Sequence, residues 1–382
     1  MKTNNIKGIM CISALMMMTV YAVQAKTLRV NNIDNYIKTT ATGTALAFNT
    51  IQQAVDAASA GDTIHIEGSK FPYTDPVTVN KKLTMIGPGY FLAETEKSLH
   101  NKESARITAD ITFVAGSNGA ILAGIEQHTD AAVFSQSTFS LQVSAYAGNP
   151  KIIVQENSIT IRNSKLIYVE IDNAANISSL TIQRCMFNPG VIADTGGAGM
   201  VTNLQIENCL FRNSHTTENH VIKLTAGRQN SVTVSQCTFY TRFTIQAQRL
   251  TLNMNAFYLE TANYGVISEM PQTSITNNIA RLALRDAAAN ATINNTGITV
   301  QSPATAKNTW FATEGAELYG KYYAPATGSP LYDATSAERG MFGGGNPYSL
   351  SGLYSLPAVY DIDTAIEAGE ALNDLYIRVI AR

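Results

Sequence analysis

Charged residues are scarce in this chain, because Lys, Arg, Asp and Glu together make up only 15% of its 382 residues. Two of the 27 Lys and Arg residues, Lys2 and Lys7, precede an apolar run described below. Without these two, 25 basic residues stand against 29 acidic ones, a net charge of −4. So small a charge gives no electrostatic reason to expect nucleic acid or an anionic membrane as a partner. Extended charge runs and low-complexity linkers are also lacking, which favours one elongated body over several independent domains.

Apolar runs long enough to cross a membrane are lacking as well. The longest, residues 8–23, has about 16 residues, whereas a membrane-spanning helix needs about 20. Lys2 and Lys7 give it a positive start, and Val23-Gln24-Ala25 offers a small-residue cleavage site. Residues 1–25 are therefore predicted to be a signal peptide. We expect a protein that is secreted, periplasmic or on the cell surface, with no transmembrane segment after signal removal.

What the chain does have is a repeat of six residues. Its first and third positions are apolar, its second, fourth and fifth are mostly polar, and its sixth is small. The copies are ITIRNS from Ile159, LTIQRC from Leu180, LQIENC from Leu204, VTVSQC from Val232, LTLNMN from Leu250, ATINNT from Ala291 and the looser TSITNN from Thr273.

Such alternation places the apolar side chains on one face of a strand. One strand-like segment about every 22 residues is typical of a solenoid, in which stacked coils share one core. The third-position residues are predicted to point inward and stack along one axis: Ile161, Ile182, Ile206, Val234, Leu252, Ile275 and Ile293.

The fifth position predicts a sharp corner after each strand. Four of the seven copies have Asn there, namely Asn163, Asn208, Asn277 and Asn295. Asn is the residue other than glycine that best tolerates the left-handed conformation such a corner requires. Amides stacked at this corner are also expected to hydrogen-bond to one another along the solenoid.

The sixth position holds three of the four cysteines, Cys185, Cys209 and Cys237. Stacked cysteines in an exported protein could form disulfides. Their odd number and the geometry that a bridge demands instead favour reduced thiols, packed in the core as small hydrophobes. A zinc site is not expected, because no Cys or His lies at ligand spacing within one strand and its turn.

Closing elements are predicted at both ends of the solenoid. Apolar residues recur at helical spacing between Phe48 and Gly61, which predicts an amphipathic helix across the first coil. Asn49 and Gln52 are placed to form its capping box, and Gly61 to stop it.

Three regions follow: a signal peptide (residues 1–25), a solenoid with its N-terminal cap (26–330) and a C-terminal cap or tail (331–382). The last region is expected to cover the final coil and ends in an alternating strand, with Leu375, Ile377 and Val379 on one side. A sorting or docking tail is the other interpretation of this region.

The N-terminal part of the solenoid resembles a known family. TIQQAVDAASAGDTIHIEG from Thr50, a Tyr, and VTVNKKLTMIGPG from Val77 are similar to the start of secreted parallel β-helix proteins of the pectin-lyase-like superfamily. With the Asn and Cys coil positions, the resemblance spans about residues 46–330. It implies an all-β, right-handed parallel β-helix of about eleven coils, with an N-terminal capping helix and a β-rich C-terminal cap.

The resemblance points to the fold rather than to one activity. Members that cut polysaccharides carry their catalytic groups on the outer face of one sheet. Uronate lyases of this fold use a Lys or Arg base, often with Ca²⁺ held by acidic residues, and the galacturonan hydrolases use aspartates with Gly-His-Gly and Arg-Ile-Lys motifs. Neither hydrolase motif is present in this sequence.

The best lyase-like group of residues is Glu218, His220, Lys223 and Arg228, between two repeats. If Val221 points inward, His220 and Lys223 lie near the outer surface. Lys223 or Arg228 could then act as the base, if its neighbours lowered its pKa. We favour the simpler interpretation, a solvated coil face carrying a few charges, because charged residues are mostly exposed in any protein.

A second candidate group is Tyr168, Glu170 and Asp172, which a period of two places on the outer face of one strand. Two carboxylates and an aromatic ring could hold Ca²⁺ or stack on a sugar ring. Polar residues are, however, the ordinary occupants of any solvated strand face.

Two hypotheses about function follow. The first is an exported, non-catalytic protein without cofactors that binds glycans or surface partners at the bacterial cell envelope. The alternative is a lyase that cleaves a uronate-containing polysaccharide by β-elimination, with Lys223 or Arg228 as base, His220 nearby, and Glu170 and Asp172 holding Ca²⁺. A purely structural role in the envelope is left open, because a fold alone does not select among these functions.

Overall fold

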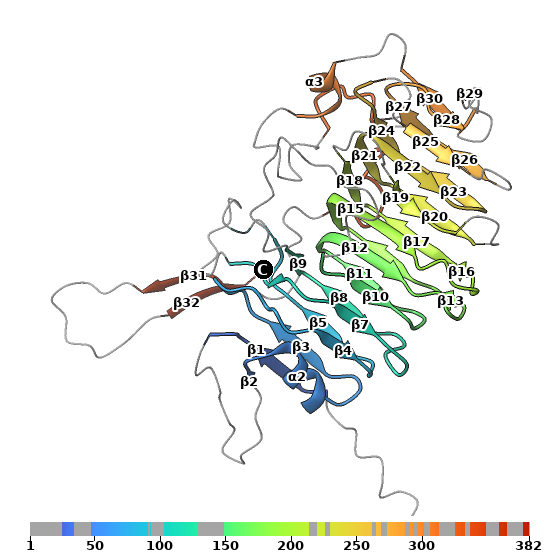
Figure 1. The fold of residues 1–382 in the computed structure, drawn as a ribbon. Helices are drawn as coiled ribbons and strands as arrows, with labels where there is room; N and C mark the ends of the chain where they lie inside the picture. The colour runs from blue at the N-terminus through green and yellow to red at the C-terminus, as the bar shows by residue number, and fades with distance from the viewer. Residues whose placement is uncertain are drawn as a thin grey trace, which may run out of the picture.

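The structure is a computed structural model in which coils stack into one elongated body (Figure 1). It describes residues 25–33, 47–90, 92, 103–128, 149–213, 220–225, 230–261, 265–268, 273–286, 291–292, 296–301, 306–312, 325–332, 337–348, 359–364 and 377–381. Residues 1–24 of the predicted signal peptide lie outside this part. Within it, no helix is long and apolar enough to cross a membrane.

Each coil contributes strands to three parallel ladders. The first ladder is an eleven-stranded sheet, and the second and third are joined into one seventeen-stranded sheet. The first ladder runs β2 (Ala47–Phe48), β1 (Thr27–Val30), β3 (Thr63–Ile66), β5 (Thr84–Ile86), β8 (Ile121–Ala123), β11 (Thr160–Arg162), β14 (Thr181–Gln183), β17 (Leu204–Glu207), β20 (Val232–Ser235), β23 (Leu250–Asn253) and β26 (Ser274–Thr276).

The second and third ladders share the long strands β12 (Lys165–Ile171) and β15 (Met186–Asp194). The second ladder also contains β6 (Arg106–Ile107), β9 (Glu126–Gln127), β18 (Leu210–Asn213), β21 (Thr238–Thr241), β24 (Ala256–Tyr258), β27 (Asn278–Ala280) and β30 (Ile298–Val300). The third also contains β4 (Val77–Val79), β7 (Ile111–Phe113), β10 (Ile152–Val154), β19 (His220–Lys223), β22 (Phe243–Gln246), β25 (Gly265–Ser268) and β28 (Arg285–Asp286).

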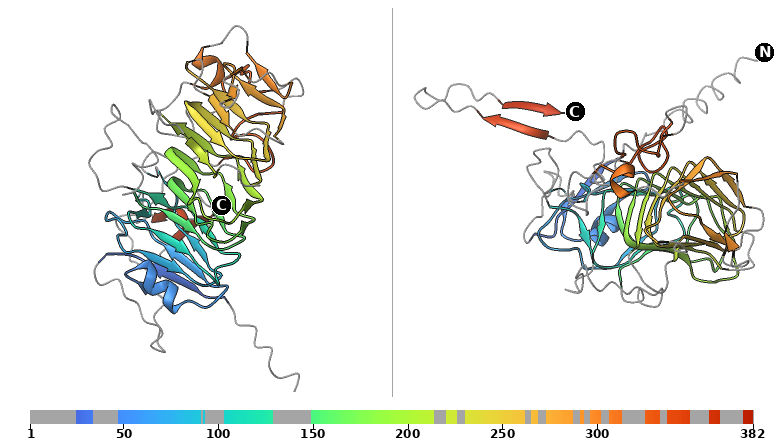
Figure 2. Two further views of the ribbon diagram at one scale, coloured as in Figure 1. Left: turned by 45° about the vertical axis from the view of Figure 1, so that its right-hand side comes forward. Right: turned by 90° about the horizontal axis from the view of Figure 1, so that it is seen from above.

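All pairings within these ladders are parallel, and the sheets curl around one interior (Figure 2). The predicted right-handed parallel β-helix is therefore confirmed. Short β13 (Ile177–Ser178) and β16 (Val201–Thr202) pair beside the first ladder, and β29 (Ala291–Thr292) pairs antiparallel with β28.

The core is built as the repeat predicted. The third-position residues from Ile161 to Ile275 lie directly opposite one another across successive strands of the first ladder and are buried in one apolar cluster. Ile293 lies outside the described residues. On the second ladder, Phe187, Phe211, Phe239 and Phe257 stack with ring centroids 4.8–5.1 Å apart. These spacings match the distance of roughly 4.8 Å between paired strands.

The predicted corner is present in every described repeat. The fifth-position residues have left-handed φ values between 51° and 57°: Asn163, Arg184, Asn208, Gln236, Met254 and Asn277. Arg, Gln and Met adopt this conformation although Asn favours it more, so the packing of the stack imposes the corner.

The stacking of amides occurs one position later than predicted. Asn255 Nδ2 donates to Val234 O at 2.8 Å and to Asn278 Oδ1 at 3.0 Å, while Asn255 Oδ1 accepts from the backbone N–H of Cys237 at 2.9 Å. The fifth-position amide of Asn208 instead donates to backbone carbonyls in the C-terminal region.

The same hydrogen bond, from a backbone N–H to the sixth-position side chain of the next coil, recurs along the coils. This series of bonds is called the sixth-position ladder here. Cys209 Sγ accepts from Cys185 N at 3.4 Å, and Cys237 Sγ accepts from Cys209 N at 3.4 Å. Each thiol also donates to the third-position carbonyl one coil earlier. The ladder comprises Ser164, Cys185, Cys209, Cys237, Asn255 and Asn278. All three cysteines are buried and free, as predicted.

The N-terminal helix α2 (Ile51–Ala57) packs against β1, β2, β3 and β4 and so covers the first coils. Its N-cap was predicted one residue too early. Thr50, rather than Asn49, is the N-cap, and it forms the capping box with Gln53. The helix ends because Ala58 is extended, and Gly61 comes three residues later.

That the C-terminal region covers the last coil stays a prediction, because many of its residues lie outside the described part of the chain. Residues 325–332 and 337–348, called the strap here, lie along the side of the coils. Arg339 Nε donates to Asn277 O, Gly340 N to Met254 O and Met341 N to Thr238 Oγ1, at 2.8–3.0 Å. At the far end Tyr348 shares a hydrogen bond with Tyr90.

A second apolar cluster lies under the strap. It contains Trp310 of the short helix α3 (Lys307–Trp310), Met341 of the strap and outward-facing residues of the second ladder such as Leu210. The predicted C-terminal strand is β32 (Ile377–Ala381), which pairs antiparallel with β31 (Val359–Thr364). Leu375 lies outside the described residues.

We expect Asn255→Ala to lower the free energy of unfolding by about 2 kcal/mol, because it leaves the Cys237 N–H buried without a partner and removes the amide bonds to Val234 O and Asn278 Oδ1. Urea denaturation followed by circular dichroism measures this. The matched control is Asn253→Ala, which loses only one exposed hydrogen bond from Thr276 and should change stability by less than about 1 kcal/mol. Equal effects of the two substitutions would argue against the ladder.

We also expect Cys185, Cys209 and Cys237 to stay unreactive toward a thiol reagent at pH 8 in the native protein. All three are 0% exposed, so the reagent cannot reach them, and burial raises the pKa of the Cys185 and Cys237 thiols, which also disfavours the thiolate at these two positions. Addition of 6 M guanidinium should make all three titrate at once. Rapid labelling before unfolding would contradict this burial.

Candidate functional site

The outer face of the third ladder carries residues from both groups that the sequence singled out. Glu170 of β12 lies opposite Ala193 of β15, and Ala193 lies opposite Lys223 of β19. Glu170 and Lys223 are therefore two strands apart, roughly 10 Å, in one outward-facing row. The sequence treated them as separate candidates, and the topology brings them onto one face.

Glu170 is engaged by a residue that the sequence analysis missed. Lys151, just before β10, places its Nζ 2.6 Å from Glu170 Oε2 and 5.2 Å from the centre of the Tyr168 ring. Because the segment before β10 contains no copy of the repeat, no sequence signal marked Lys151. The pair neutralises the carboxylate that was a candidate calcium ligand.

Tyr168 does not present its ring to solvent as expected. Its exposed fraction is 7%, and it belongs to a small apolar cluster with Ile167, Val191 and Ala193 on the outer side of the ladder. The pairing of β12 with β15 is irregular between Leu166 and Tyr168, which turns Ile167 out of the main core. Burial and the Glu170 carboxylate raise the pKa of Tyr168 to about 12, so its hydroxyl stays protonated at neutral pH.

Asp172 belongs to a corner after β12 rather than to a shared site with Glu170. Its Oδ2 accepts from Gln155 Nε2 at 2.8 Å, and its Oδ1 accepts from the backbone N–H of Ala174 at 3.3 Å. One coil on, Asp194 accepts two hydrogen bonds from Thr225, at 2.7 and 2.9 Å. These carboxylates tie neighbouring coils together at the corner.

The structure describes only two of the four residues in the predicted lyase-like group, His220 and Lys223. Val221 is buried as expected, and His220 and Lys223 are partly exposed. Pairing with β22 is irregular between His220 and Ile222, so Val221 and Ile222 both enter the core. Glu218 and Arg228 lie outside the described residues.

The candidate calcium ligands do not fit a calcium site as they are arranged. Ca²⁺ takes six to eight oxygen ligands at about 2.3–2.6 Å. Glu170 is paired with an ammonium group, and Asp172 accepts hydrogen bonds from a side-chain amide and the backbone. In the part of the chain that the structure describes, His, Cys, Asp and Glu side chains do not gather in threes at metal-binding distance.

A second surface feature emerges only when the strands are placed in register. The first outward position of the first ladder forms a row of ten residues, seven of which are threonine. The row, called the threonine row here, runs Thr27, Thr63, Thr84, Ile121, Thr160, Thr181, Gln205, Thr233, Thr251 and Ser274.

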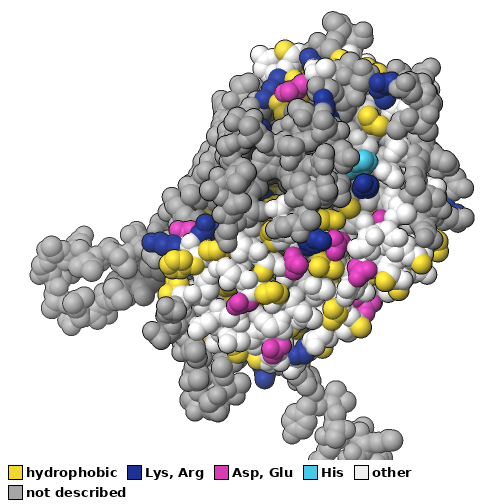
Figure 3. Space-filling view, viewed as in Figure 1, with side chains coloured by type: hydrophobic (Ala, Val, Ile, Leu, Met, Phe, Trp, Pro, Cys, Tyr) yellow, Lys and Arg dark blue, Asp and Glu magenta, His cyan; other side chains and the backbone are white. Residues whose placement is uncertain are grey.

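The threonine row carries no charge along its whole length, and every member is partly or fully exposed. Its hydroxyls repeat at the strand spacing of roughly 4.8 Å, because each coil repeats the same strand and corner. In the view of Figure 3, uncharged side chains and backbone make up much of the surface of the described residues, with charged groups scattered among them. The first ladder therefore offers a long line of regularly spaced hydrogen-bonding groups.

The function of these faces has to be argued from their own chemistry. Comparison with family models, curated proteins and solved structures finds no match for this chain. The third ladder presents an ion pair over a buried tyrosine, and the first presents an uncharged row of hydroxyls.

Because Lys151 holds Glu170, we expect calorimetric titration with up to 1 mM Ca²⁺ to give no saturable heat. Lys151→Met removes the competing ammonium and should bind Ca²⁺ more tightly than the unaltered protein does. Gln155→Met, beside Asp172, is the matched control. Calcium binding by the unaltered protein that disappears in Glu170→Gln would instead support the calcium hypothesis.

Proposed function

We propose that this protein is an exported, non-catalytic β-helix protein that binds an uncharged glycan at the bacterial cell envelope. The observation that carries the proposal is the threonine row. The export signal predicted for residues 1–25 supports the location, and the resemblance of the Thr50 and Val77 segments supports membership of the pectin-lyase-like superfamily.

The chemistry of the row favours an extended, neutral, hydroxyl-rich ligand. A threonine hydroxyl both donates and accepts a hydrogen bond, as a sugar hydroxyl does. A row without charge offers nothing to balance the carboxylates of a uronate polymer or the phosphates of a nucleic acid. Its rigid backbone means that little conformational freedom is lost when a chain binds along it.

The alternative, a uronate lyase, rests on the placement of Lys223 and Glu170 in one outward row of the third ladder. Such a reaction needs a base free to take the proton beside the uronate carboxylate. Lys151 is paired with Glu170, and the phenol of Tyr168 is held protonated, so neither supplies that base. Lys223 is the residue on which the alternative depends.

The binding proposal is tested by affinity electrophoresis through gels that contain a neutral β-glucan, a galactomannan, pectate or alginate. We expect retardation by at least one neutral polymer. The triple variant Thr181→Val, Thr233→Val and Thr251→Val should weaken it about ten- to a hundredfold, since each lost hydrogen bond contributes about 1 kcal/mol or less. Valine keeps the shape and strand preference of threonine.

The matched control is Thr78→Val with Thr112→Val, a facing pair on the outer side of the third ladder. This control should bind like the unaltered protein. Equal binding by the triple variant, or no binding to any neutral polymer, would count against the proposal. Ultraviolet absorbance from an unsaturated product of pectate, alginate or chondroitin, lost in Lys223→Met, would establish the lyase instead.

A further inference from the structure

One buried carboxylate at the N-terminal end of the solenoid has no cationic side chain as its partner. Asp62 lies in the turn between α2 and β3 and is 2% exposed. Its Oδ2 accepts from Ser59 N and its Oδ1 from Lys26 N, both at 2.7 Å. Both oxygens accept, as those of an ionised carboxylate do. Burial penalises such a charge unless a charge of opposite sign lies beside it.

The other buried carboxylate of the described residues does have a cation. Glu126 is 8% exposed, and Lys165 Nζ lies 2.7 Å from its Oε1. By contrast, no Lys or Arg side chain among the described residues lies within 4 Å of the Asp62 carboxylate. Lys81 lies at the same turn, but its Nζ donates to three carbonyls at the end of α2.

The atom that meets Asp62 is the backbone nitrogen of Lys26, and strand pairing holds it there. Lys26 directly precedes β1, which pairs with β3 in a register that sets Thr27 opposite Thr63. Thr63 N donates to Lys26 O at 2.9 Å, so the N–H and the carbonyl of Lys26 are both engaged by the start of β3. In an uncut chain this nitrogen is an amide, which donates one hydrogen bond but carries no charge.

Lys26 is also the first residue after the predicted cleavage site, Val23-Gln24-Ala25. Hydrolysis of the Ala25–Lys26 bond consumes one water. Ala25 leaves with a carboxylate, and Lys26 N becomes an ammonium, which adds the missing charge beside Asp62 Oδ1. The distance of 2.7 Å is typical of a bond between an ammonium and a carboxylate. Ala25 and Lys26 are exposed, so the other ammonium protons can reach water.

The position of Asp62 also chooses between two cleavage sites that the sequence allows. Val20-Tyr21-Ala22 has the same pattern of a valine and an alanine two positions apart, and a cut there would start the chain at Val23. In that chain Lys26 N remains an amide, and Asp62 remains without a counterion. A cut after Ala25 is the one that places the new charge on the carboxylate.

We propose that removal of residues 1–25 is a structural step in maturation: the α-ammonium of Lys26 that it creates forms an ion pair with buried Asp62 and ties β1 to the turn before β3. The inference rests on the export signal of the proposed function and not on its glycan binding.

The test measures protonation of the α-amino group directly. A fusion partner that is removed without leaving a residue gives the chain from Lys26. Its α-amine is labelled with an amine-reactive ester between about pH 6 and 11, and mass spectrometry quantifies the product. An α-amino group ordinarily loses its proton near pH 8. Because a neighbouring carboxylate favours the ammonium, we expect a labelling midpoint about one pH unit higher or more.

The other charged groups near Lys26 cannot produce that upward shift. Arg29 is paired with Glu67, and Lys81 is directed to the end of α2. Burial lowers the pKa of His65 on β3, which keeps this side chain neutral over most of the titration. The cations among these groups would disfavour a further positive charge and so lower the midpoint.

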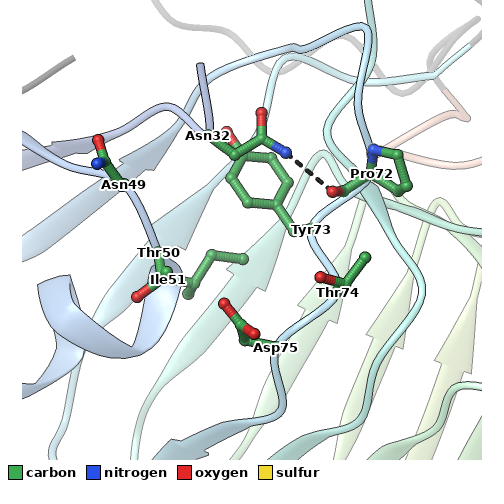
Figure 4. A pocket seen from close by; sticks show the side chains of 8 residues that line it. All are labelled: Asn32, Asn49, Thr50, Ile51, Pro72, Tyr73, Thr74 and Asp75. Carbon is green, nitrogen blue, oxygen red and sulfur yellow. Dashed lines mark hydrogen bonds between the residues drawn. The ribbon is translucent and has the colours of Figure 1, made fainter. Parts of the chain in front are cut away.

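Asp62→Asn should return the midpoint to about pH 8. Asp75→Asn is the matched control, because Asp75 is an exposed carboxylate at the same end of the solenoid, where it lines a pocket of about 190 Å³ (Figure 4). This control should keep the raised midpoint. A chain that starts at Val23 keeps Asp62 but moves the α-amine three residues away, so its midpoint should be ordinary even if Asp62→Asn fails to fold.

N-terminal sequencing of the protein exported by its native cells should find Lys26 first. Three results would overturn the inference: a mature chain that starts elsewhere, an ordinary midpoint in the chain from Lys26, or an equally raised midpoint in Asp62→Asn or in the chain from Val23. Failure of every glycan to retard the protein would leave these measurements unchanged, so the two proposals fail separately.

Discussion

The sixth-position ladder is the interaction on which the rest of this structure depends. At each corner the chain leaves the first ladder, and the side chain of the next coil accepts the backbone N–H there, from Ser164 through the three cysteines to Asn278. These bonds fix how each coil is aligned on its neighbour. A slip of one residue would reverse the two faces of a strand, sending threonines inward and aliphatic residues outward. The aromatic stack and the threonine row both require that this alignment never changes.

Much of the fold could be predicted because the repeat reflects side-chain burial and backbone preferences that act within a few residues. Aliphatic residues at the third position, a corner at the fifth and small buried residues at the sixth are each visible in a six-residue window. The start of α2 was misplaced by one residue because Asn49 and Thr50 are both good N-caps, and only the helix geometry decides between them. The amide stack was assigned to the fifth position for a similar reason. Asn occurs at both positions, as in Asn277-Asn278, and only the hydrogen bonds show that the sixth-position amides contact one another whereas that of Asn208 contacts the strap.

The candidate sites were less predictable because they combine residues that share no local pattern. Lys151 and Glu170 lie 19 residues apart in a pair that the repeat does not describe. Threonines at the second position of the recognised repeats hinted at a row, but Thr63 and Thr84 join it only through strand pairing. The exposure of the Tyr168 ring was predicted wrongly, because a strict alternation of inward and outward residues cannot anticipate the irregular pairing after Leu166.

The strap changes how the length of this solenoid should be understood. A stack of coils normally has contacts only between neighbours, so that it can grow and melt from either end. Here Tyr348 meets Tyr90 across 258 residues of sequence, and the strap is also anchored to the coils of Asn208, Thr238 and Asn277. Separation of any two of these coils must therefore also break contacts with the strap. The coils that the strap contacts are thus joined along one side, and this joining is completed only after residue 348 has been synthesised.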